Sequence, residues 1–175
     1  MQPYNYITLK PDYYTFLASN GFEYHCYFYD FSFPFSDYPR IASKVFGFNL
    51  ELKSKPEISH SKGLDKRIAQ TVVTILKEFL NIRKNAVVYI CDNSDKREKA
   101  RFHKFTNWFM KYDDGSFIQL KGILHTGNTY VLNAMLIHRD NEFLNDFIEA
   151  YQVLTGAYTK PGDDEMENIL NDDGW

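Results

Sequence analysis

Two carboxylates near the middle of the chain are the residues whose spacing most suggests chemistry. Asp92 and Asp95 follow the apolar run 87–91 and lie three positions apart, so both carboxylates could face one point. Such a pair could hold a divalent metal or act as a general base. The alternative is capping: Asp95 and Glu98 have the spacing of a capping box, and carboxylates are favoured at a helix start. The residue pattern favours capping.

Basic side chains follow on the helix that this capping predicts. At about 100° per residue, one side of it carries a basic stripe, composed of Arg97, Arg101, Lys104, Trp108 and Lys111. Arginine offers a bidentate fork to phosphate, and tryptophan can stack on a base, so the stripe could bind a coenzyme, a nucleotide or a nucleic acid. Alternatively it is a solvated helix face, or Arg101 pairs with a carboxylate of the sheet.

The elements that must position these residues follow from periodicity. Residues 87–91 are short, apolar and β-branched, which predicts a strand buried on both faces. The other face of the basic helix carries Phe102, Phe105, Phe109 and Tyr112, which predicts core. Further strands are predicted at 13–17, 22–31, 44–53, 117–125 and 130–138, with hairpins at Asn20-Gly21 and 126–128, and further helices from Asp65 and from Asn141. The predicted order, β-β-β-α-β-α-β-β-α, is that of a mixed α/β sheet with helices on it.

Composition limits the classes of function. We expect a lead-in at 1–12, one domain over 13–155 and a flexible acidic tail over 156–175. The net charge of −3 gives no general attraction to nucleic acid, and no apolar run approaches the length of a membrane span. Cys26 and Cys91 stand in apolar runs, which predicts buried free thiols in a cytoplasmic protein. The five histidines have no metal-ligand spacing, so we expect no metal.

Several short motifs resemble a family of small uncharacterised bacterial proteins. They are Asp65-x-Arg67-Ile68, Ile90-Cys91-Asp92-x-x-Asp95-x-Arg97, Ala100-Arg101 and Phe105-x-x-Trp108-Phe109. This resemblance spans residues 13 to about 150 and implies relatives, not an activity.

A more remote resemblance is to the acetyl-CoA-dependent N-acetyltransferase superfamily, whose element order is similar after Lys44. In that superfamily a glycine-containing loop at a helix start holds the coenzyme's pyrophosphate. The resemblance places Lys62, Gly63 and Leu64 in that loop and implies that Glu51 could act as a base through water. Lys104 falls where the superfamily often has a tyrosine that protonates the leaving thiolate.

Two functions from different classes remain. One is an acyl-CoA-binding, N-acetyltransferase-like protein, with acetyl-CoA as its coenzyme and with catalysis either retained or lost. The other is a non-catalytic interaction module that contacts a protein or nucleic-acid partner through Arg97, Arg101, Lys104 and the acidic tail. Asp65, a carboxylate where the pyrophosphate should approach, and Lys104 depart from the transferase pattern and favour the second function.

Overall fold

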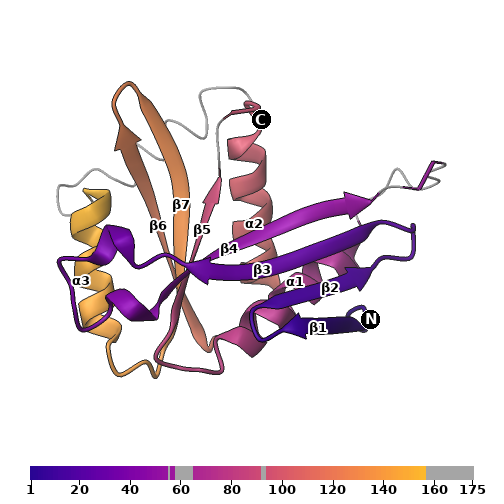
Figure 1. Cartoon of the computed structure of the whole chain (residues 1–175), viewed down its shortest axis with the longest axis horizontal. Coiled ribbons are helices and arrows are strands. Elements are labelled where there is room, and N and C mark those ends of the chain that lie inside the picture. Colours follow the sequence, from indigo (N-terminus) through magenta and orange to yellow (C-terminus); the bar gives the residue numbers. More distant parts are fainter. Residues whose placement is uncertain (55, 58–64, 92–93, 157–175) are drawn as a thin grey trace.

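A single seven-stranded mixed sheet organises the protein. The computed structural model describes residues 1–54, 56–57, 65–91 and 94–156 (Figure 1). The strand order is β1-β2-β3-β4-β5-β7-β6, and every neighbouring pair is antiparallel except β4–β5. The strands are β1 (Tyr6–Lys10), β2 (Tyr13–Leu17), β3 (Glu23–Asp30), β4 (Val45–Ser54), β5 (Ala86–Cys91), β6 (Phe117–Thr126) and β7 (Thr129–His138). The helices are α1 (Lys66–Phe79), α2 (Glu98–Tyr112) and α3 (Leu144–Thr155), with short 3-10 helices at η1 (Phe33–Phe35) and η2 (Ala42–Lys44).

The N-terminal strand β1 corrects the prediction that residues 1–12 form no element. It pairs with β2 in antiparallel register, with Tyr6 opposite Phe16. Most of its side chains are exposed, Ile7 to 65%, so the sequence carries no alternation of buried and exposed positions to mark it. The segment is fixed by the buried Tyr4, whose backbone N–H donates to Thr71 Oγ1 on α1 at 2.8 Å.

Local side-chain hydrogen bonds set the helix starts. Asp65 caps α1 as predicted, because its carboxylate accepts from the Arg67 backbone N–H at 2.9 Å. The last helix begins later than predicted. Asn141 does not start it but accepts from the Phe143 N–H at 2.8 Å, so this local turn delays α3 to Leu144.

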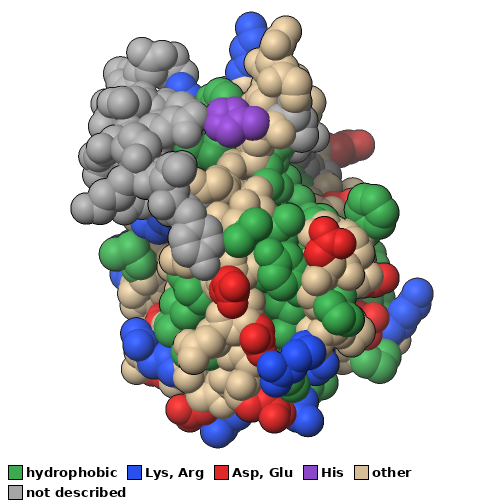
Figure 2. Space-filling view, turned by 90° about the vertical axis from the view of Figure 1, so that its left-hand side faces the viewer, with side chains coloured by type: hydrophobic (Ala, Val, Ile, Leu, Met, Phe, Trp, Pro, Cys, Tyr) green, Lys and Arg blue, Asp and Glu red, His purple; other side chains and the backbone are tan. Residues whose placement is uncertain are grey.

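The sheet separates two hydrophobic clusters. Helices α1 and α2 pack on one face, where Phe28, Tyr89 and Phe102 are among the buried side chains. Helix α3 and the two 3-10 helices pack on the other face, around Val88, Met135 and Phe147. Seen from the end that carries α3, apolar side chains occupy the middle of the surface, and charged side chains gather below them (Figure 2). Strand β5 is therefore buried on both faces, as its sequence predicts.

The parallel pair β4–β5 positions the candidate site. Its register begins at Val45 opposite Ala86 and ends at Phe48 opposite Tyr89. Beyond that point β4 continues along β3 to Ser54, whereas β5 continues along β7 to Cys91. The carboxyl ends of the two strands therefore diverge, as Figure 1 shows, and the sheet is split between them.

Candidate functional site

A cavity of about 300 Å³ occupies the split between β4 and β5. Both strands contribute three consecutive residues, and the loop and first turns of α2 complete the lining. The lining residues are Phe48, Asn49, Leu50, Tyr89, Ile90, Cys91, Ser94, Asp95, Arg101 and Phe105. Consecutive strand residues point to opposite faces, so a cavity that touches three in a row from each strand lies within the plane of the sheet. It also lies at the carboxyl ends of parallel strands, where α/β folds commonly bind ligands.

Asp95 has a different role from the predicted cap. Helix α2 begins at Glu98 with Arg97 as its N-cap, and no side chain caps it. The Asp95 carboxylate instead accepts from Arg101 Nη1 at 2.7 Å and Nη2 at 2.8 Å, and from the Arg97 backbone N–H at 3.1 Å. The bidentate pair moves the start of the helix away from Asp95 and holds Arg101 at the cavity. The carboxylate that Arg101 meets in this pair thus comes from the loop that precedes the helix.

The Asp95–Arg101 pair predicts a pH dependence. Hydrogen bonding by Arg101, ahead of the Arg97 N–H, lowers the pKa of Asp95 from 3.8 to about 2. A carboxyl whose pKa is lower in the folded state stabilises the fold above its unfolded pKa, and this contribution is lost as pH falls towards 2. We expect Asp95→Asn to be less stable than the parent protein at pH 6 and the difference to shrink between pH 4 and pH 2. Urea unfolding at each pH measures it.

Asp37→Asn serves as the matched control. Asp37 is exposed and forms no ion pair within the described part of the chain. The free energy of unfolding of Asp37→Asn should differ little from that of the parent protein, and this difference should not change with pH. A difference for Asp95→Asn that stays constant from pH 6 to pH 2 would show that the ion pair contributes nothing to stability.

Within the basic stripe, Arg97 and Lys104 have different surroundings from Arg101. Lys104 Nζ lies 4.7 Å above the Trp108 ring, and Trp108 packs edge-on against Phe105. Burial, and then the charge of Arg97, lower the pKa of Lys104. Among the described residues no carboxylate pairs with the Arg97 or Lys104 side chain. Arg97 and Lys104 thus form a small cationic patch beside the cavity, whereas Arg101 is neutralised by Asp95.

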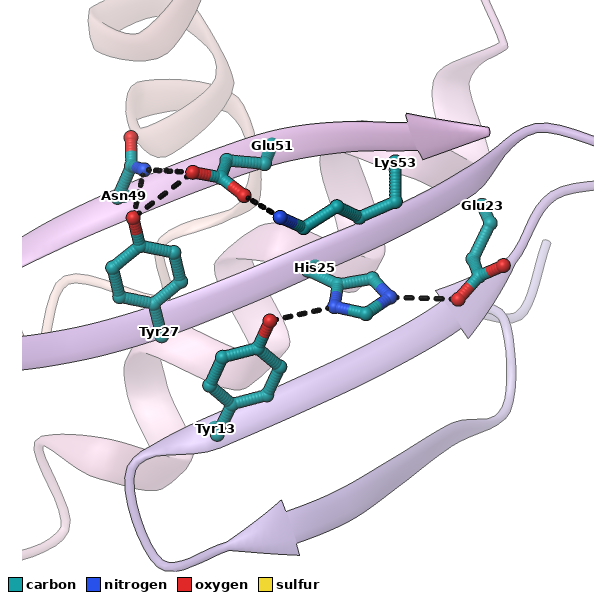
Figure 3. A network of polar contacts seen from close by, with 7 residues as sticks. All are labelled: Tyr13, Glu23, His25, Tyr27, Asn49, Glu51 and Lys53. Atoms are coloured by element: carbon teal, nitrogen blue, oxygen red, sulfur yellow. Dashed lines mark hydrogen bonds and ion pairs between the residues drawn. The ribbon is translucent and has the colours of Figure 1, made fainter. Parts of the chain in front are cut away.

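Glu51 lies on the face of β4 that points away from α1 and α2. It is close to the cavity but does not line it. Its Oε2 contacts Lys53 Nζ at 2.6 Å, and its Oε1 accepts from the Tyr27 hydroxyl at 3.0 Å and from Asn49 Nδ2 at 3.2 Å (Figure 3). Hydrogen bonds from Lys53 first and Tyr27 second lower the pKa of Glu51. Asn49 connects this group to the cavity, because its side chain also donates to the Tyr27 oxygen at 2.6 Å.

A second polar group on the same face was not predicted from the sequence. His25 Nε2 lies 2.6 Å from Glu23 Oε1, and His25 Nδ1 lies 2.7 Å from the Tyr13 hydroxyl (Figure 3). The spacing of two residues puts Glu23 and His25 on one face of the strand predicted at 22–31, but spacing along the chain gives no sign of Tyr13. The hairpin register does, because an Asn-Gly turn that places Tyr13 opposite Tyr27 also brings His25 onto the face of Tyr13.

Several predicted residues lie outside the described residues: Asp92, Lys62, Gly63 and Leu64. Cys91 and Cys26 are buried free thiols, as predicted, and burial raises the pKa of each to about 12. Cys91 lines the cavity and Cys26 does not.

The described residues offer neither a metal centre nor a helix that could span a membrane. They contain no group of three or more histidine, cysteine, aspartate or glutamate residues able to hold a metal ion. None of the helices in the same ranges is long and apolar enough to cross a membrane.

Comparisons with known proteins give one family and one remote structural likeness. No curated protein matches the chain. The solved structure of a CoA-dependent acyl-homoserine lactone synthase, MesI, is similar over 86% of this chain and 73% of that chain, at 8% identity and a TM-score of 0.34. A likeness this low carries no inference about fold or function. A model of a family of unknown function, DUF6169, matches residues 64–153, from the residue before the α1 cap into α3. That match spans just over half of the 175 residues, and the chain belongs to this family.

Proposed function

We propose that this protein has an N-acetyltransferase-like fold and binds acyl-CoA in the split between β4 and β5. The observation that carries the proposal is the position of the cavity in the plane of the sheet, at the carboxyl ends of the parallel pair. A ligand there meets backbone as well as side chains, since β4 has no β5 partner beyond Phe48 in the described residues.

The backbone of the split suits the amide-bearing arm of coenzyme A. Strand N–H and C=O groups that lose a neighbour must find another partner, and an extended ligand with amides supplies both donors and acceptors. Leu50 of β4 and Cys91 of β5 face the same side as α1 and α2, and both line the cavity. Their apolar surfaces favour an acyl chain over a charged group.

The cationic patch supports the phosphate end of the same ligand. Arg97 and Lys104 carry positive charge beside the cavity without a carboxylate partner among the described residues. The proposal gives them the coenzyme phosphates, with the predicted loop at Lys62, Gly63 and Leu64 as a further contact. In the proposal Arg101 does not bind the phosphates, because it pairs with Asp95. This pair holds the wall of the cavity in place.

Thermal unfolding with coenzyme A tests the proposal. A ligand at about 100 times its dissociation constant stabilises the folded state by about 2.7 kcal/mol, a rise in Tm of about 5–10 °C for this chain length. We expect coenzyme A and acetyl-CoA to give this rise. Adenosine 3′,5′-bisphosphate, which has phosphates but no pantetheine arm, should give a much smaller one at equal ionic strength. No rise at millimolar coenzyme A would overturn the proposal.

A second candidate is the non-catalytic interaction module. Arg97 and Lys104, which have no carboxylate partner among the described residues, favour it as well. Phosphate contacts from such a patch would serve a nucleic acid as well as a coenzyme. A short single-stranded oligonucleotide in the same thermal screen separates the two. A rise with the oligonucleotide that disappears in high salt, together with none for coenzyme A, would support the module.

A further inference from the structure

One half of the sheet has a face that no helix covers within the described part of the chain. Helices α1 and α2 pack on one side of β1–β4, whereas α3 and the two 3-10 helices reach the other side only over β5–β7 and the first residues of β4 (Figure 1). The rest of that side, over β1–β4, is called the open face below. We infer that it binds the open face of a second copy of this chain. The inference goes beyond the proposed function and does not depend on coenzyme binding.

The open face is richer in apolar and aromatic side chains than a solvated sheet face. An antiparallel sheet that is covered on one side usually carries polar residues on its other side. Here the positions that alternate with the buried core include five apolar or aromatic residues: Ile7, Tyr13, Leu17, Tyr27 and Tyr29. Leu17 is 62% exposed, close to the value for Ile7. Exposed apolar residues grouped on one face mark interaction surfaces, and tyrosine is enriched where proteins bind proteins.

The rings of the open face are held in place before any partner arrives. Tyr13 and Tyr27 stack with centroids 5.5 Å apart and planes 7° from parallel. The Tyr13 hydroxyl lies 2.7 Å from His25 Nδ1, and the Tyr27 hydroxyl donates to Glu51 Oε1 (Figure 3). Side chains that are already fixed lose little conformational entropy on binding.

A glycine keeps the next ring close to the sheet. The Tyr29 ring lies on Gly47, where a Cβ would come within 2.2 Å of it, and the Tyr29 side chain is still 39% exposed. Because Gly47 has no side chain, this ring can lie against β4 instead of projecting from the sheet. The surface is therefore flat enough to pack against another sheet.

The charges of the open face suit a second copy. Strands β1–β4 place Lys10, Glu23, Glu51 and Lys53 on it, two of each sign, so the face has no net charge while His25 is neutral. Such a face gives no general attraction to nucleic acid or to a strongly charged protein. Lys53 pairs with Glu51, whereas Lys10 has no carboxylate partner among the described residues. A two-fold related copy can supply that carboxylate, and the contact then occurs twice.

The position of α3 decides how two open faces can meet. Helix α3 stands over β6 and β7 on the same side of the sheet as the open face. A two-fold axis across the strands would set the α3 helices of both copies against each other, and two helices about 10 Å thick do not fit between sheets packed about 10 Å apart. An axis parallel to the strands instead places them at opposite ends.

That axis brings Lys10 to a carboxylate. It places β1 of each copy over β4 of the other and leaves the position along the strands unchanged. Lys10 is level with Asn49 through the pairs Lys10–Tyr13, Tyr13–Tyr27 and Tyr27–Asn49. Glu51 is two positions further along β4, within reach of a lysine side chain. Lys10 therefore faces Glu51 of the partner subunit.

The area of the open face sets the strength of the dimer. Strands β1–β4 contain 5, 5, 8 and 10 residues. At about 3.3 Å per residue and about 4.8 Å between strands, they present a flat area of about 440 Å² per copy. Two copies bury roughly 900 Å² before the relief of the side chains is added, near the lower limit of about 1,000 Å² for specific interfaces. We therefore expect a reversible dimer with a dissociation constant of about 10–100 µM.

A second copy would also cover one side of the cavity. Asn49 belongs both to the open face and to the cavity lining, and its side chain donates to the Tyr27 oxygen. In the arrangement above, β1 of the partner lies over Asn49. The dimer would thus shield the split between β4 and β5 from solvent on this side.

Sedimentation equilibrium of the full chain without coenzyme tests the inference. We expect the mean mass to rise from 20.6 kDa at about 1 µM protein towards twice that value at about 200 µM. Lys10→Glu should raise the dissociation constant of the dimer about tenfold or more, because it sets two carboxylates against each other at two places. Thr15→Glu, in the middle of the open face, should have an effect of at least the same size, because it buries a charge without a partner.

Lys121→Glu is the matched control. It makes the same change of charge at an exposed position on β6, the other edge strand of the sheet, and should leave the dissociation constant unaltered. A mass of 20.6 kDa over the whole range would overturn the inference and leave the open face to a different partner. Self-association that Lys10→Glu does not weaken, or that Lys121→Glu weakens equally, would overturn it as well. Lys10 is exposed and has no described side-chain hydrogen bond or ion pair, so Lys10→Glu remains decisive if Thr15→Glu does not fold.

Discussion

Replacing Phe102 by alanine should destabilise the protein by about 3–5 kcal/mol, the cost of removing a buried phenylalanine ring. Phe102 lies on the core side of α2, is 1% exposed and packs against Tyr89 of β5 with ring centroids 6.4 Å apart. The lost ring leaves a cavity between the helix and the sheet that its neighbours fill only in part. Urea or thermal unfolding measures the effect, which corresponds to a fall in Tm of about 6–20 °C for a chain of this length.

Phe33→Ala is the matched control, because the same atoms are removed from a side chain that is 87% exposed. It should change stability by less than about 0.5 kcal/mol. Phe102 also fixes the helix whose first turns line the cavity. A loss below about 1 kcal/mol for Phe102→Ala would mean that α2 is not packed as the structure has it.

Strands and helices with a buried face could be predicted from the sequence. Residues 65–79 bury apolar side chains at helical spacing, and residues 87–91 form a continuous apolar run, so both elements follow from the residues alone. Strand β1 could not be predicted this way, because it is held by pairing with β2 and by the anchoring of Tyr4 to α1. The start of α2 was misplaced because Asp95 meets Arg101, six residues on, and this contact competes with capping.

The candidate site was predicted only in part, because its geometry depends on where strand pairing ends. Asp95 and Arg101 were singled out from their chemistry, and the structure brings both to the cavity. The cavity itself results from the last paired residues of β4 and β5, Phe48 and Tyr89, which look like any other strand residues. His25 escaped notice for a similar reason: its partners come from β2 and from two positions earlier on β3. Strand register, more than residue type, decides both features.

Filling the split should abolish coenzyme binding. Cys91 is buried, and its side chain lines the cavity of about 300 Å³, so the ring of Cys91→Phe has space to enter it. We expect the stabilisation by coenzyme A, about 2.7 kcal/mol at 100 times the dissociation constant, to fall to nearly zero. Thermal unfolding with and without coenzyme A measures the loss, and circular dichroism verifies that the variant is folded.

Cys91→Ala separates the steric effect from the chemistry of the thiol, because it removes the sulfur and leaves the cavity open. It should keep the rise in Tm. Burial raises the pKa of the Cys91 thiol to about 12, so at neutral pH the side chain is not a thiolate and its loss removes no charge. Coenzyme binding that survives Cys91→Phe in a folded protein would place the coenzyme outside the split. Loss of binding in both variants would instead mean that the coenzyme requires a contact with the sulfur. The two substitutions therefore show whether binding depends on the shape of the cavity or on the thiol of Cys91.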